Sequence, residues 1–363
     1  MEKLWKYKKI GEVCIVERGA SPRPIDKYIT DNESGINWIK IGDTSDSMYI
    51  TETAQKIIVE GMKKSRYVKP GDFLLSNSMS FGRPYILKID GCIHDGWLVL
   101  RDENALFDKR FLYYYLSSKT TYKKLKSMAV GGVVNNLNSE MVRNVIVPVP
   151  DKEEQSEIAD LFDKIKKILD DRKQELEQLD TLVKSRFVEL FGNPISNSYG
   201  LPEATLPELG EFGRGVSKHR PRNDPRLLDG EYPLIQTGDI ANTDLYITLY
   251  NSTYSELGLQ QSKMWNKGTL CITIAANIAK TAILRFDACF PDSVVGFNAN
   301  ERTNNIFIHY WFSFFQSILE SQAPESAQKN INLKILSELK VIVPKKEKQD
   351  EFVEFINQLD KSK

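Results

Sequence analysis

The spacing of apolar residues along this chain follows two different patterns. The change from one pattern to the other, near residue 150, marks a boundary in the chain. Up to about residue 150, short apolar runs such as 72–76, 96–100 and 144–148 are separated by clusters of Gly, Pro, Asn and Asp. Runs of this length with such boundaries predict short β-strands. From residue 151 the apolar residues instead recur every three or four positions for about 40 residues, which predicts one long amphipathic helix.

The sequence also predicts where this long helix begins and ends. Asp151 followed by Glu154 fits a capping box, and Gly192 followed by Pro194 is a typical stop signal. At about 1.5 Å per residue the helix would be roughly 60 Å long. Its apolar stripe extends beyond what one lobe can cover, so we expect a helical partner. A second apolar stripe after residue 344 supplies the candidate: Phe352, Phe355, Ile356 and Leu359.

The chain contains an internal repeat, which decides its architecture. Residues 136–155 align without gaps to residues 330–349, with eight identities in twenty positions. Three further segment pairs follow in register upstream: 39–43 with 235–239, 69–74 with 266–271, and 90–92 with 287–289. Chance similarity between turn-containing segments is the alternative, but four pairs in one order favour a tandem duplication.

Each repeat is therefore expected to be a β-rich lobe with one internal helix, at 108–128 and 304–322, followed by a long helix. The predicted fold class is α+β, with two similar lobes separated by helices that form an antiparallel coiled coil with pseudo-two-fold symmetry. The predicted segments are a first lobe at 1–150, a long helix at 151–192, a second lobe at 193–343 and a shorter helix at 344–363.

Composition places the chain among ordinary globular proteins, with 41% hydrophobic and 27% charged residues. No apolar run is long enough to span a membrane or to act as a signal peptide, so we expect a cytoplasmic location. The four cysteines (Cys14, Cys92, Cys271 and Cys289) are scattered, which favours reduced, buried thiols over metal ligands.

The formal net charge is zero, whereas proteins that bind nucleic acids are usually basic. The charge is unevenly distributed, however. Residues 1–150 contain 23 basic and 17 acidic side chains, residues 151–195 contain 8 and 12, and residues 196–343 contain 13 and 15. In the second lobe the positive charge is concentrated in one segment, 214–222.

The sequence lacks the signatures of the common enzyme classes that we sought. It has no GxxxxGK[ST] phosphate loop and no GxGxxG motif after a predicted strand. Acidic residues such as Asp151 and Asp171 lie about 20 positions apart on one helix, roughly 30 Å, and cannot share a metal ion. His309 is interpreted as a core or interface residue, and His219 as part of a surface that faces a polyanion. We therefore predict no catalytic or metal site.

Three pairs of polar loops have the side chains that DNA binding requires, namely cations for phosphates and hydrogen-bonding groups for base edges. In the first pair, 18–24 and 214–222, the candidate contacts are Arg18, Ser21, Arg23, Arg214, Ser217, Lys218, His219, Arg220 and Arg222. In the second pair, 76–83 and 273–280, they are Ser76, Asn77, Ser78, Ser80, Arg83, Asn277 and Lys280.

The third pair of loops, 131–136 and 326–330, contributes Asn135, Gln328 and Lys329. The aligned segments 39–43 and 235–239 contribute Lys40, Gln236 and Thr237. Arginine is suited to guanine and asparagine to adenine. The alternative for every one of these residues is a solvated surface loop or a side chain that stabilises a turn.

In this order of features, the chain resembles the specificity subunits of Type I restriction-modification systems. The resemblance covers nearly the whole sequence. It depends on the paired lobes, the segment from Ile146 to Gln155 with its counterpart from Val341 to Gln349, the long helix, and the helix ending at 187–194.

This resemblance implies a non-catalytic subunit of an adenine-specific methyltransferase and restriction complex. Each lobe would be a target recognition domain that reads one half of a bipartite site in double-stranded DNA, and the helices would set the spacer length. The helices would also dock two methyltransferase subunits, which restriction subunits join. S-adenosylmethionine, ATP and Mg²⁺ would then bind to these partners, and the chain itself would bind no cofactor.

Three other interpretations remain open at this point. The chain could be an orphan or truncated specificity-type protein that serves a methylation-only or other complex. It could be a stand-alone nuclease, which the carboxylate spacing disfavours. It could also be a coiled-coil scaffold whose lobes bind no nucleic acid. The second long helix is expected to be about 20 residues shorter than the first, which makes its partner-docking surface incomplete.

Overall fold

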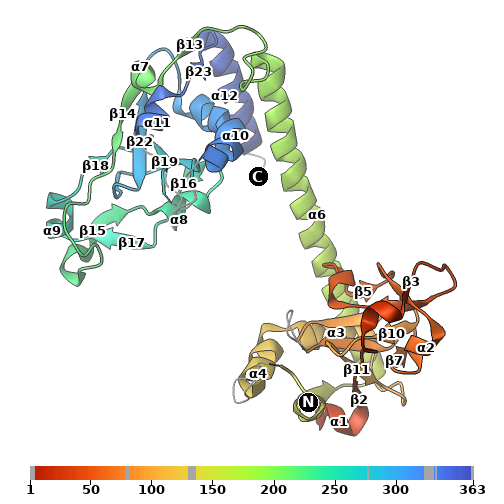
Figure 1. The fold of residues 1–363 in the computed structure, drawn as a ribbon. Helices are drawn as coiled ribbons and strands as arrows, with labels where there is room; N and C mark the ends of the chain where they lie inside the picture. The colour runs from red at the N-terminus through yellow and green to blue at the C-terminus, as the bar shows by residue number, and fades with distance from the viewer. Residues whose placement is uncertain are drawn as a thin grey trace. The chain divides into compact units, whose positions relative to one another are not determined.

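The computed structural model describes residues 5–77, 82–129, 136–275, 278–322, 331 and 333–360. The chain divides into two compact units, Met1–Lys173 and Gln174–Lys363. Each unit contains one β-rich lobe, here lobe 1 (residues 6–149) and lobe 2 (residues 203–342). The helix α6, Lys152–Phe191, begins in the first unit and ends in the second (Figure 1).

Lobe 1 contains three sheets among its described residues, with strand orders β1-β12, β2-β11-β8-β9-β5 and β3-β6-β4-β10-β7. Its strands are β1 Lys6–Lys9, β2 Ile15–Arg18, β3 Ile29–Thr30, β4 Ile36–Ile39, β5 Tyr49–Ile50, β6 Lys56–Ile57, β7 Arg66–Val68, β8 Phe73–Ser76, β9 Pro84–Leu87, β10 Gly91–Ile93, β11 Trp97–Arg101 and β12 Ile146–Val149. Its helices are α1 Ile10–Val13, η1 Ile25–Lys27, η2 Ile41–Asp43, α2 Val59–Met62, α3 Lys109–Ser117, α4 Lys119–Ala129 and α5 Ser139–Arg143.

Lobe 2 also contains three sheets in its described part, with orders β13-β23, β14-β22-β19-β20-β16 and β17-β15-β21-β18. Its strands are β13 Glu203–Ala204, β14 Gly210–Arg214, β15 Leu228–Leu234, β16 Tyr246–Ile247, β17 Ser252–Tyr254, β18 Met264–Trp265, β19 Leu270–Thr273, β20 Thr281–Leu284, β21 Ala288–Cys289, β22 Val294–Ala299 and β23 Val341–Ile342. Its helices are α7 Leu206–Leu209, η3 Pro225–Leu227, α8 Thr237–Ala241, α9 Glu256–Gln260, α10 Asn305–Gln322 and α11 Leu333–Glu338, and α12 Lys346–Asp360 follows the lobe.

The two lobes have the same topology, which confirms the tandem repeat. Taken in strand order, the sheet β2-β11-β8-β9-β5 corresponds to β14-β22-β19-β20-β16. The pairing senses also agree: the edge strands β5 and β16 are parallel to β9 and β20, and the other pairs in both sheets are antiparallel. The predicted α+β architecture of two similar lobes with a long helix between them is therefore confirmed.

The central sheet of each lobe is buried on both faces, which explains its continuous apolar runs. In β8, Phe73 and Leu75 face one core while Leu74 faces the other. In β19 of lobe 2, Leu270 and Ile272 face one core while Cys271 faces the other. All four cysteines are buried and unpaired.

The internal helices differ in part from the prediction. The single helix expected at 108–128 is two helices, α3 and α4, because the backbone of Ser118 is extended and interrupts it. The hydroxyl of Ser118 donates to Thr121 Oγ1 at 3.0 Å, which fixes the start of the second helix. The counterpart in lobe 2 is the unbroken α10.

The ends of α6 follow the predicted signals. Asp151 Oδ1 accepts a hydrogen bond from the backbone N–H of Glu154 at 3.0 Å. Beyond its C-terminus, Gly192 has φ +73°, and a Cβ there would lie 2.5 Å from Ser198 Oγ, so only glycine fits.

Within the second unit, α12 runs antiparallel to the last turns of α6 (Figure 1). The rings of Phe187 and Phe352 pack edge to face at 5.3 Å, and Arg186 Nη2 donates to Glu351 Oε1 at 2.8 Å. Nearer its start, α6 exposes apolar side chains of the predicted stripe: Leu161, Ile165, Ile168, Leu169 and Leu176. No helix in the described part of the chain has the length and apolar character needed to cross a bilayer.

A buried glutamine ties each lobe to the helix that follows it. Gln155 Nε2 donates to the carbonyls of Leu106 and Pro150 at 3.1 and 3.0 Å, and its Oε1 accepts from the backbone N–H of Asp108 at 2.8 Å. Gln349, its partner in the repeat, likewise donates through Nε2 to two carbonyls, those of Arg302 and Pro344 at 3.0 and 2.9 Å, but its Oε1 accepts from the Thr303 hydroxyl at 2.9 Å. The two residues are 0% exposed.

We predict that replacing Gln349 with Met lowers the free energy of unfolding of the second unit by about 2–4 kcal/mol. The near-isosteric apolar side chain would leave the carbonyls of Arg302 and Pro344, and the Thr303 hydroxyl, without a buried partner. Urea unfolding followed by the fluorescence of Trp265 and Trp311 measures the loss. The control Gln178→Met changes an exposed glutamine of α6 and should cost less than about 0.5 kcal/mol. Equal stability of the two variants would contradict the role of Gln349.

Candidate nucleic-acid interface

The predicted basic loops occupy equivalent positions in the two lobes. Each begins with Arg-Gly at the end of a strand, Arg18-Gly19 after β2 and Arg214-Gly215 after β14. The N–H of Gly19 donates to the carbonyl of Trp97 at 2.9 Å, and that of Gly215 donates to the carbonyl of Val294 at 2.8 Å. The same backbone contacts therefore hold both loops against the central sheets.

Both glycines are required by close packing. A Cβ at Gly19 would lie 2.0 Å from the carbonyl oxygen of His94. A Cβ at Gly215 would lie 2.2 Å from the carbonyl oxygen of Phe290. These atoms belong to the backbone and cannot rotate away, so any side chain would displace the loop.

A serine and an aspartate complete this framework in each lobe, and the sequence analysis missed both. The hydroxyls of Ser65 and Ser262 donate to the carbonyls of Ala20 and Val216 at 2.7 and 2.8 Å. Asp95 and Asp292, just before β11 and β22, accept hydrogen bonds from side chains of the loops. Each pair is separated by 197 positions, the offset already visible between Cys92 and Cys289, and that offset could have identified them.

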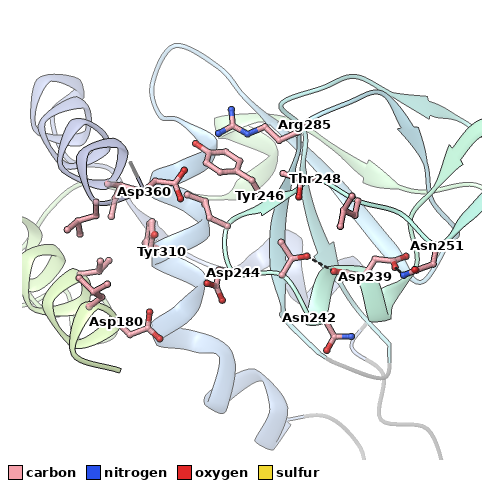
Figure 2. A pocket seen from close by; sticks show the side chains of 17 residues that line it. Asp180, Asp239, Asn242, Asp244, Tyr246, Thr248, Asn251, Arg285, Tyr310 and Asp360 are labelled. Carbon is pink, nitrogen blue, oxygen red and sulfur yellow. Dashed lines mark hydrogen bonds between the residues drawn. The ribbon is translucent and has the colours of Figure 1, made fainter. Parts of the chain in front are cut away.

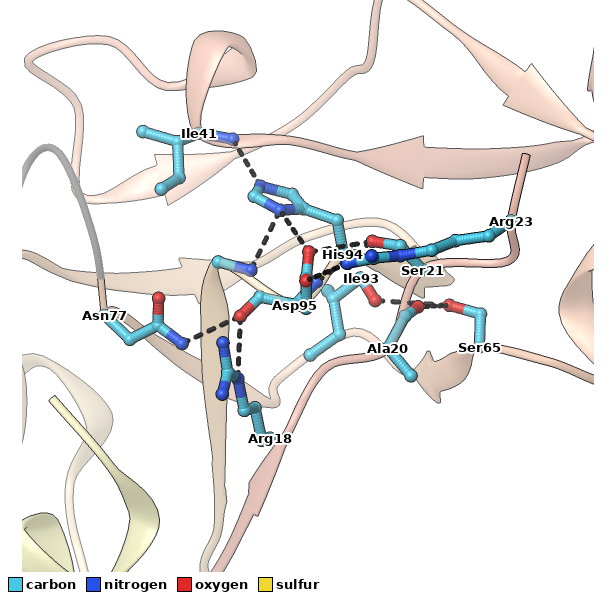
Figure 3. Close-up of polar contacts among 11 residues, drawn as sticks. Arg18, Ala20, Ser21, Arg23, Ile41, Ser65, Asn77, Ile93, His94 and Asp95 are labelled. Carbon is cyan, nitrogen blue, oxygen red and sulfur yellow. Dashed lines mark hydrogen bonds and ion pairs between the residues drawn. The ribbon is translucent and has the colours of Figure 1, made fainter. Parts of the chain in front are cut away.

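In lobe 1 the predicted residues converge on Asp95 (Figure 3). Ser21 Oγ donates to Asp95 Oδ1 at 2.9 Å, and Arg23 Nη2 lies 3.4 Å from Oδ2. Arg18 Nε and Asn77 Nδ2 donate to the Asp95 carbonyl at 2.9 and 2.8 Å. Partial burial opposes ionisation, but the hydrogen bonds from Ser21 and from a backbone amide hold the pKa of Asp95 below its usual value.

His94, next to Asp95, braces two backbone segments of lobe 1. Its ring nitrogens lie 3.2 Å from the amide nitrogen of Ile41 and 2.9 Å from that of Gly96. Burial lowers the pKa of His94 below its ordinary value, so the ring is neutral near pH 7. His94 therefore contributes hydrogen bonds to the turn at Ile41 and to the connection before β11, and not positive charge.

In lobe 2 the arginines gather around Asp292. Arg220 Nη2 lies 3.3 Å from Asp292 Oδ2, and Arg222 Nη2 donates to Oδ1 of the same carboxylate. Arg220 Nη1 also donates to the carbonyls of Ser217 and His219 at 2.6 and 2.8 Å. Much of the Arg220 guanidinium is thus used to shape its own loop.

His219 has the surface position that the sequence predicted. Its Nε2 lies 3.1 Å from Asp224 Oδ2, and its side chain is partly exposed. His309 is instead held inside lobe 2, where its Nδ1 lies 2.9 Å from Thr281 Oγ1 and burial lowers its pKa to about 4.

The predicted contacts fall into four groups: exposed, partly exposed, buried, and outside the described residues. Exposed on the surface are Arg18, Arg23, Arg83, Arg214, Lys218, Arg220, Arg222 and Gln236. Partly exposed are Ser21, Lys40, His219, Thr237 and Lys280. Outside the described residues lie Ser78, Ser80, Asn135, Asn277, Gln328 and Lys329.

Three predicted contacts are buried, which corrects their interpretation. Ser76, Asn77 and Ser217 are 0%, 1% and 7% exposed. Ser76 Oγ accepts from the N–H of Arg83 at 2.9 Å, and the Asn77 amide holds the Asp95 carbonyl. The side chains of Ser76 and Asn77 thus hold loops in place, and the carbonyl of Ser217 accepts from Arg220.

Lys40 and Gln236 occupy equivalent turns that are braced by an aspartate. Their backbone N–H groups donate to Asp43 Oδ2 and Asp239 Oδ2 at 2.7 and 2.8 Å. The Lys40 ammonium also donates to Gln55 Oε1 at 2.7 Å. Gln236 is exposed, and its Nε2 donates to Ser252 Oγ at 3.2 Å.

Lobe 2 and its helices also enclose a pocket of about 620 Å³ that the sequence did not indicate (Figure 2). Asp180 and Asp360 approach it from α6 and α12, and Tyr310 approaches from α10. Burial, followed by these two negative charges, raises the pKa of Tyr310 well above its usual value. The Arg285 guanidinium lies 3.4 Å from the centre of the Tyr246 ring. The acidic lining makes this pocket unsuited to a phosphate group.

The described residues contain no group of three or more His, Cys, Asp or Glu side chains arranged to hold a metal ion. Their exposed arginines and lysines can instead neutralise phosphates, and arginine can also donate two parallel hydrogen bonds to a base edge. The chemistry of the two loop sets is thus that of a polyanion-binding surface.

Comparison with known proteins gives the same family for both halves. A family model described as the Type I restriction modification DNA specificity domain matches residues 2–179 and 203–363. The chain is 20% identical to the MjaX specificity subunit of Methanocaldococcus jannaschii, over 98% of this chain and 87% of that protein. It is 24% identical to the type I restriction enzyme EcoBI specificity subunit of Escherichia coli, over 70% of this chain and 59% of that protein.

Two solved structures share the fold. One is the S subunit of a Type I restriction-modification system from M. genitalium, with a TM-score of 0.58 and 14% identity over 99% of this chain and 90% of that one. The other is a chain from a study of complex assembly and conformational transition in the type I R-M system, with a TM-score of 0.51 and 16% identity over 99% and 90%.

We predict that Gly215→Ala destabilises the second unit by about 2–4 kcal/mol, because the new Cβ would overlap the Phe290 carbonyl. The control is Gly213→Ala in β14, two residues earlier, where the nearest atom to a new Cβ is 3.8 Å away, on Trp265. Differential scanning calorimetry should show a lower Tm for the first variant and little change for the second. A similar Tm for both variants would show that close approach at Gly215 is not required.

Proposed function

Because the chain belongs to the Type I restriction modification DNA specificity domain family, we propose that it reads the DNA sequence for a Type I restriction-modification complex. Lobe 1 binds one half of a bipartite site in double-stranded DNA, and lobe 2 binds the other half. The base pairs between the halves are not read.

The observation that carries this proposal is a repeated framework with different side chains at its surface. The same glycine, serine and aspartate contacts hold the loop in each lobe. On that framework Arg18 and Arg23 of lobe 1 have the equivalents Arg214 and Arg220 in lobe 2, but lobe 2 adds the exposed cations Lys218 and Arg222. Two interfaces with one geometry and different hydrogen-bonding groups are what two different half-sequences require.

The neutral net charge is compatible with this function because the positive charge is local. Phosphate contacts depend on the cations that face the duplex, and not on the charge of the whole chain. The loop at 214–222 concentrates four Arg and Lys residues in a lobe that is otherwise slightly acidic. We expect the affinity to fall steeply with salt concentration, since each phosphate contact releases counterions.

The helices serve the rest of the complex in this proposal. The exposed apolar stripe of α6 docks the methyltransferase subunits, of which we expect two, and restriction subunits join through them. S-adenosylmethionine, ATP and Mg²⁺ bind to these partners, so the chain itself supplies recognition and no catalysis. Its place of action is the cytoplasm, where the DNA is found.

We predict that deleting this chain from its host abolishes one bipartite methyladenine motif, which whole-genome methylation sequencing detects. Complementation with the double variant Arg220→Ala, Arg222→Ala should relax the sequence of one half-site and leave the other half unchanged, because each lobe reads its own half. The matched control is Lys340→Ala, Lys345→Ala, which removes the same charge from exposed positions outside the loop.

Two results would contradict the proposal. If the methylation pattern is the same with and without the chain, it does not direct methylation. If the loop variant leaves both half-sequences intact while the control does the same, the reading surface lies elsewhere.

A further inference from the structure

An aspartate lies at the centre of each basic loop set. Asp95 follows β10 and precedes β11, and Asp292 occupies the equivalent connection between β21 and β22. Asp95 accepts from Arg23, and Asp292 accepts from Arg220 and Arg222. Arg23 and Arg220 are themselves separated by 197 positions, as the two aspartates are. The duplication has therefore kept a pair of opposite charges at one place in both lobes.

Stability does not account for these pairs. The side chains of Arg23 and Asp95 are 82% and 42% exposed. Those of Arg220 and Arg222 are 54% and 45% exposed, and that of Asp292 is 35% exposed. Exposed ion pairs contribute little to the free energy of folding, because water screens the charges and both side chains lose freedom. An acidic group at this position also weakens attraction to phosphates. Its presence in both loops therefore needs another explanation.

Arg220 and Arg222 in lobe 2 differ in their hydrogen bonds, and this difference indicates different roles. Arg220 donates to two carbonyls and to Asp292, so its guanidinium is committed to the loop. Among the described residues, Arg222 contacts Asp292 alone, through Nη2. Arginine has five N–H donors in a rigid plane, and a carboxylate on one edge leaves donors on another edge available.

A guanidinium held in this way is prepared for one ligand in particular. Guanine presents two acceptors, O6 and N7, side by side in the major groove, and arginine can donate to both. A free arginine side chain samples many rotamers and can bind any phosphate that it meets. A braced one has already lost that freedom, so it loses less on binding, and its orientation selects the base edge.

We propose that Asp292 is a positioning residue that orients Arg222 of lobe 2 to read guanine. The inference rests on the proposed function, since it assumes that these loops face DNA. Within that function, Arg222 determines specificity at one position, guanine is the base that it selects, and Asp292 holds it in place.

The test is selection of binding sites from a pool of random DNA duplexes. The full chain is isolated from its host through an affinity tag, together with any partners that it retains, as the wild type and as Asp292→Asn, Arg222→Lys and Glu301→Gln. Sequencing of the bound duplexes gives the base preference at every position of both half-sites. Binding to a duplex that lacks the selected site gives the non-specific affinity.

Asp292→Asn should lower the preference for guanine at one position of one half-site by about tenfold, which lies within the discrimination that a bidentate arginine contact supplies. Arg222→Lys should lower it at the same position, because an ammonium cannot donate two parallel hydrogen bonds. Non-specific binding by Asp292→Asn should rise about twofold to threefold, because a negative charge is removed. A residue with only a structural role would not produce this combination.

The control Glu301→Gln removes one exposed negative charge from the same lobe and should leave the base preferences unchanged. If the wild type selects no site at all, the proposed function fails. If it selects a bipartite site that Asp292→Asn does not alter, only this inference fails. The inference is also overturned if both half-sites weaken together, or if the affected position is not a G·C pair.

Discussion

The architecture depends on a buried carboxamide at the start of the helix that follows each lobe. Gln155 and Gln349 each donate two hydrogen bonds and accept one, with no exposure to water. A buried amide is tolerated only when its hydrogen bonds are satisfied. The first turn of the helix is therefore fixed on its own lobe in one arrangement. In the proposed function this constraint gives each reading surface a defined relation to the helix that begins beside it.

The reading surfaces of the two lobes are held by the same kinds of contact. A glycine allows the loop to approach the neighbouring backbone, a serine and backbone amides hold it there, and an aspartate accepts from its arginines. None of these contacts specifies a base. The exposed side chains around them differ between the lobes, since lobe 2 adds Lys218 and Arg222 to the arginines that both lobes share. One framework can thus present two different sets of hydrogen-bonding groups.

Features that arise from repeated local patterns could be predicted from the sequence. The long helix follows from its period, its Asp151 cap and Gly192, and the two-lobed fold follows from the ungapped repeat. Burial could not be predicted at Ser76 and Asn77, because a polar residue after a strand looks the same whether it faces water or a neighbouring strand. Asp95 carries no local signal, because the arginine that it binds is 72 positions away. Only the offset between the repeats points to it.

In the proposed function, the helices that are fixed to the lobes set the separation of the two half-sites. Lengthening α6 tests this most directly. Duplicating residues 166–172 adds two turns in its exposed part, about 10.5 Å, with almost the same helical phase. One base pair occupies about 3.4 Å of duplex. The site selected from random duplexes should then keep both half-sequences and gain about three base pairs between them. An unchanged spacer in a folded, DNA-binding variant would contradict the account.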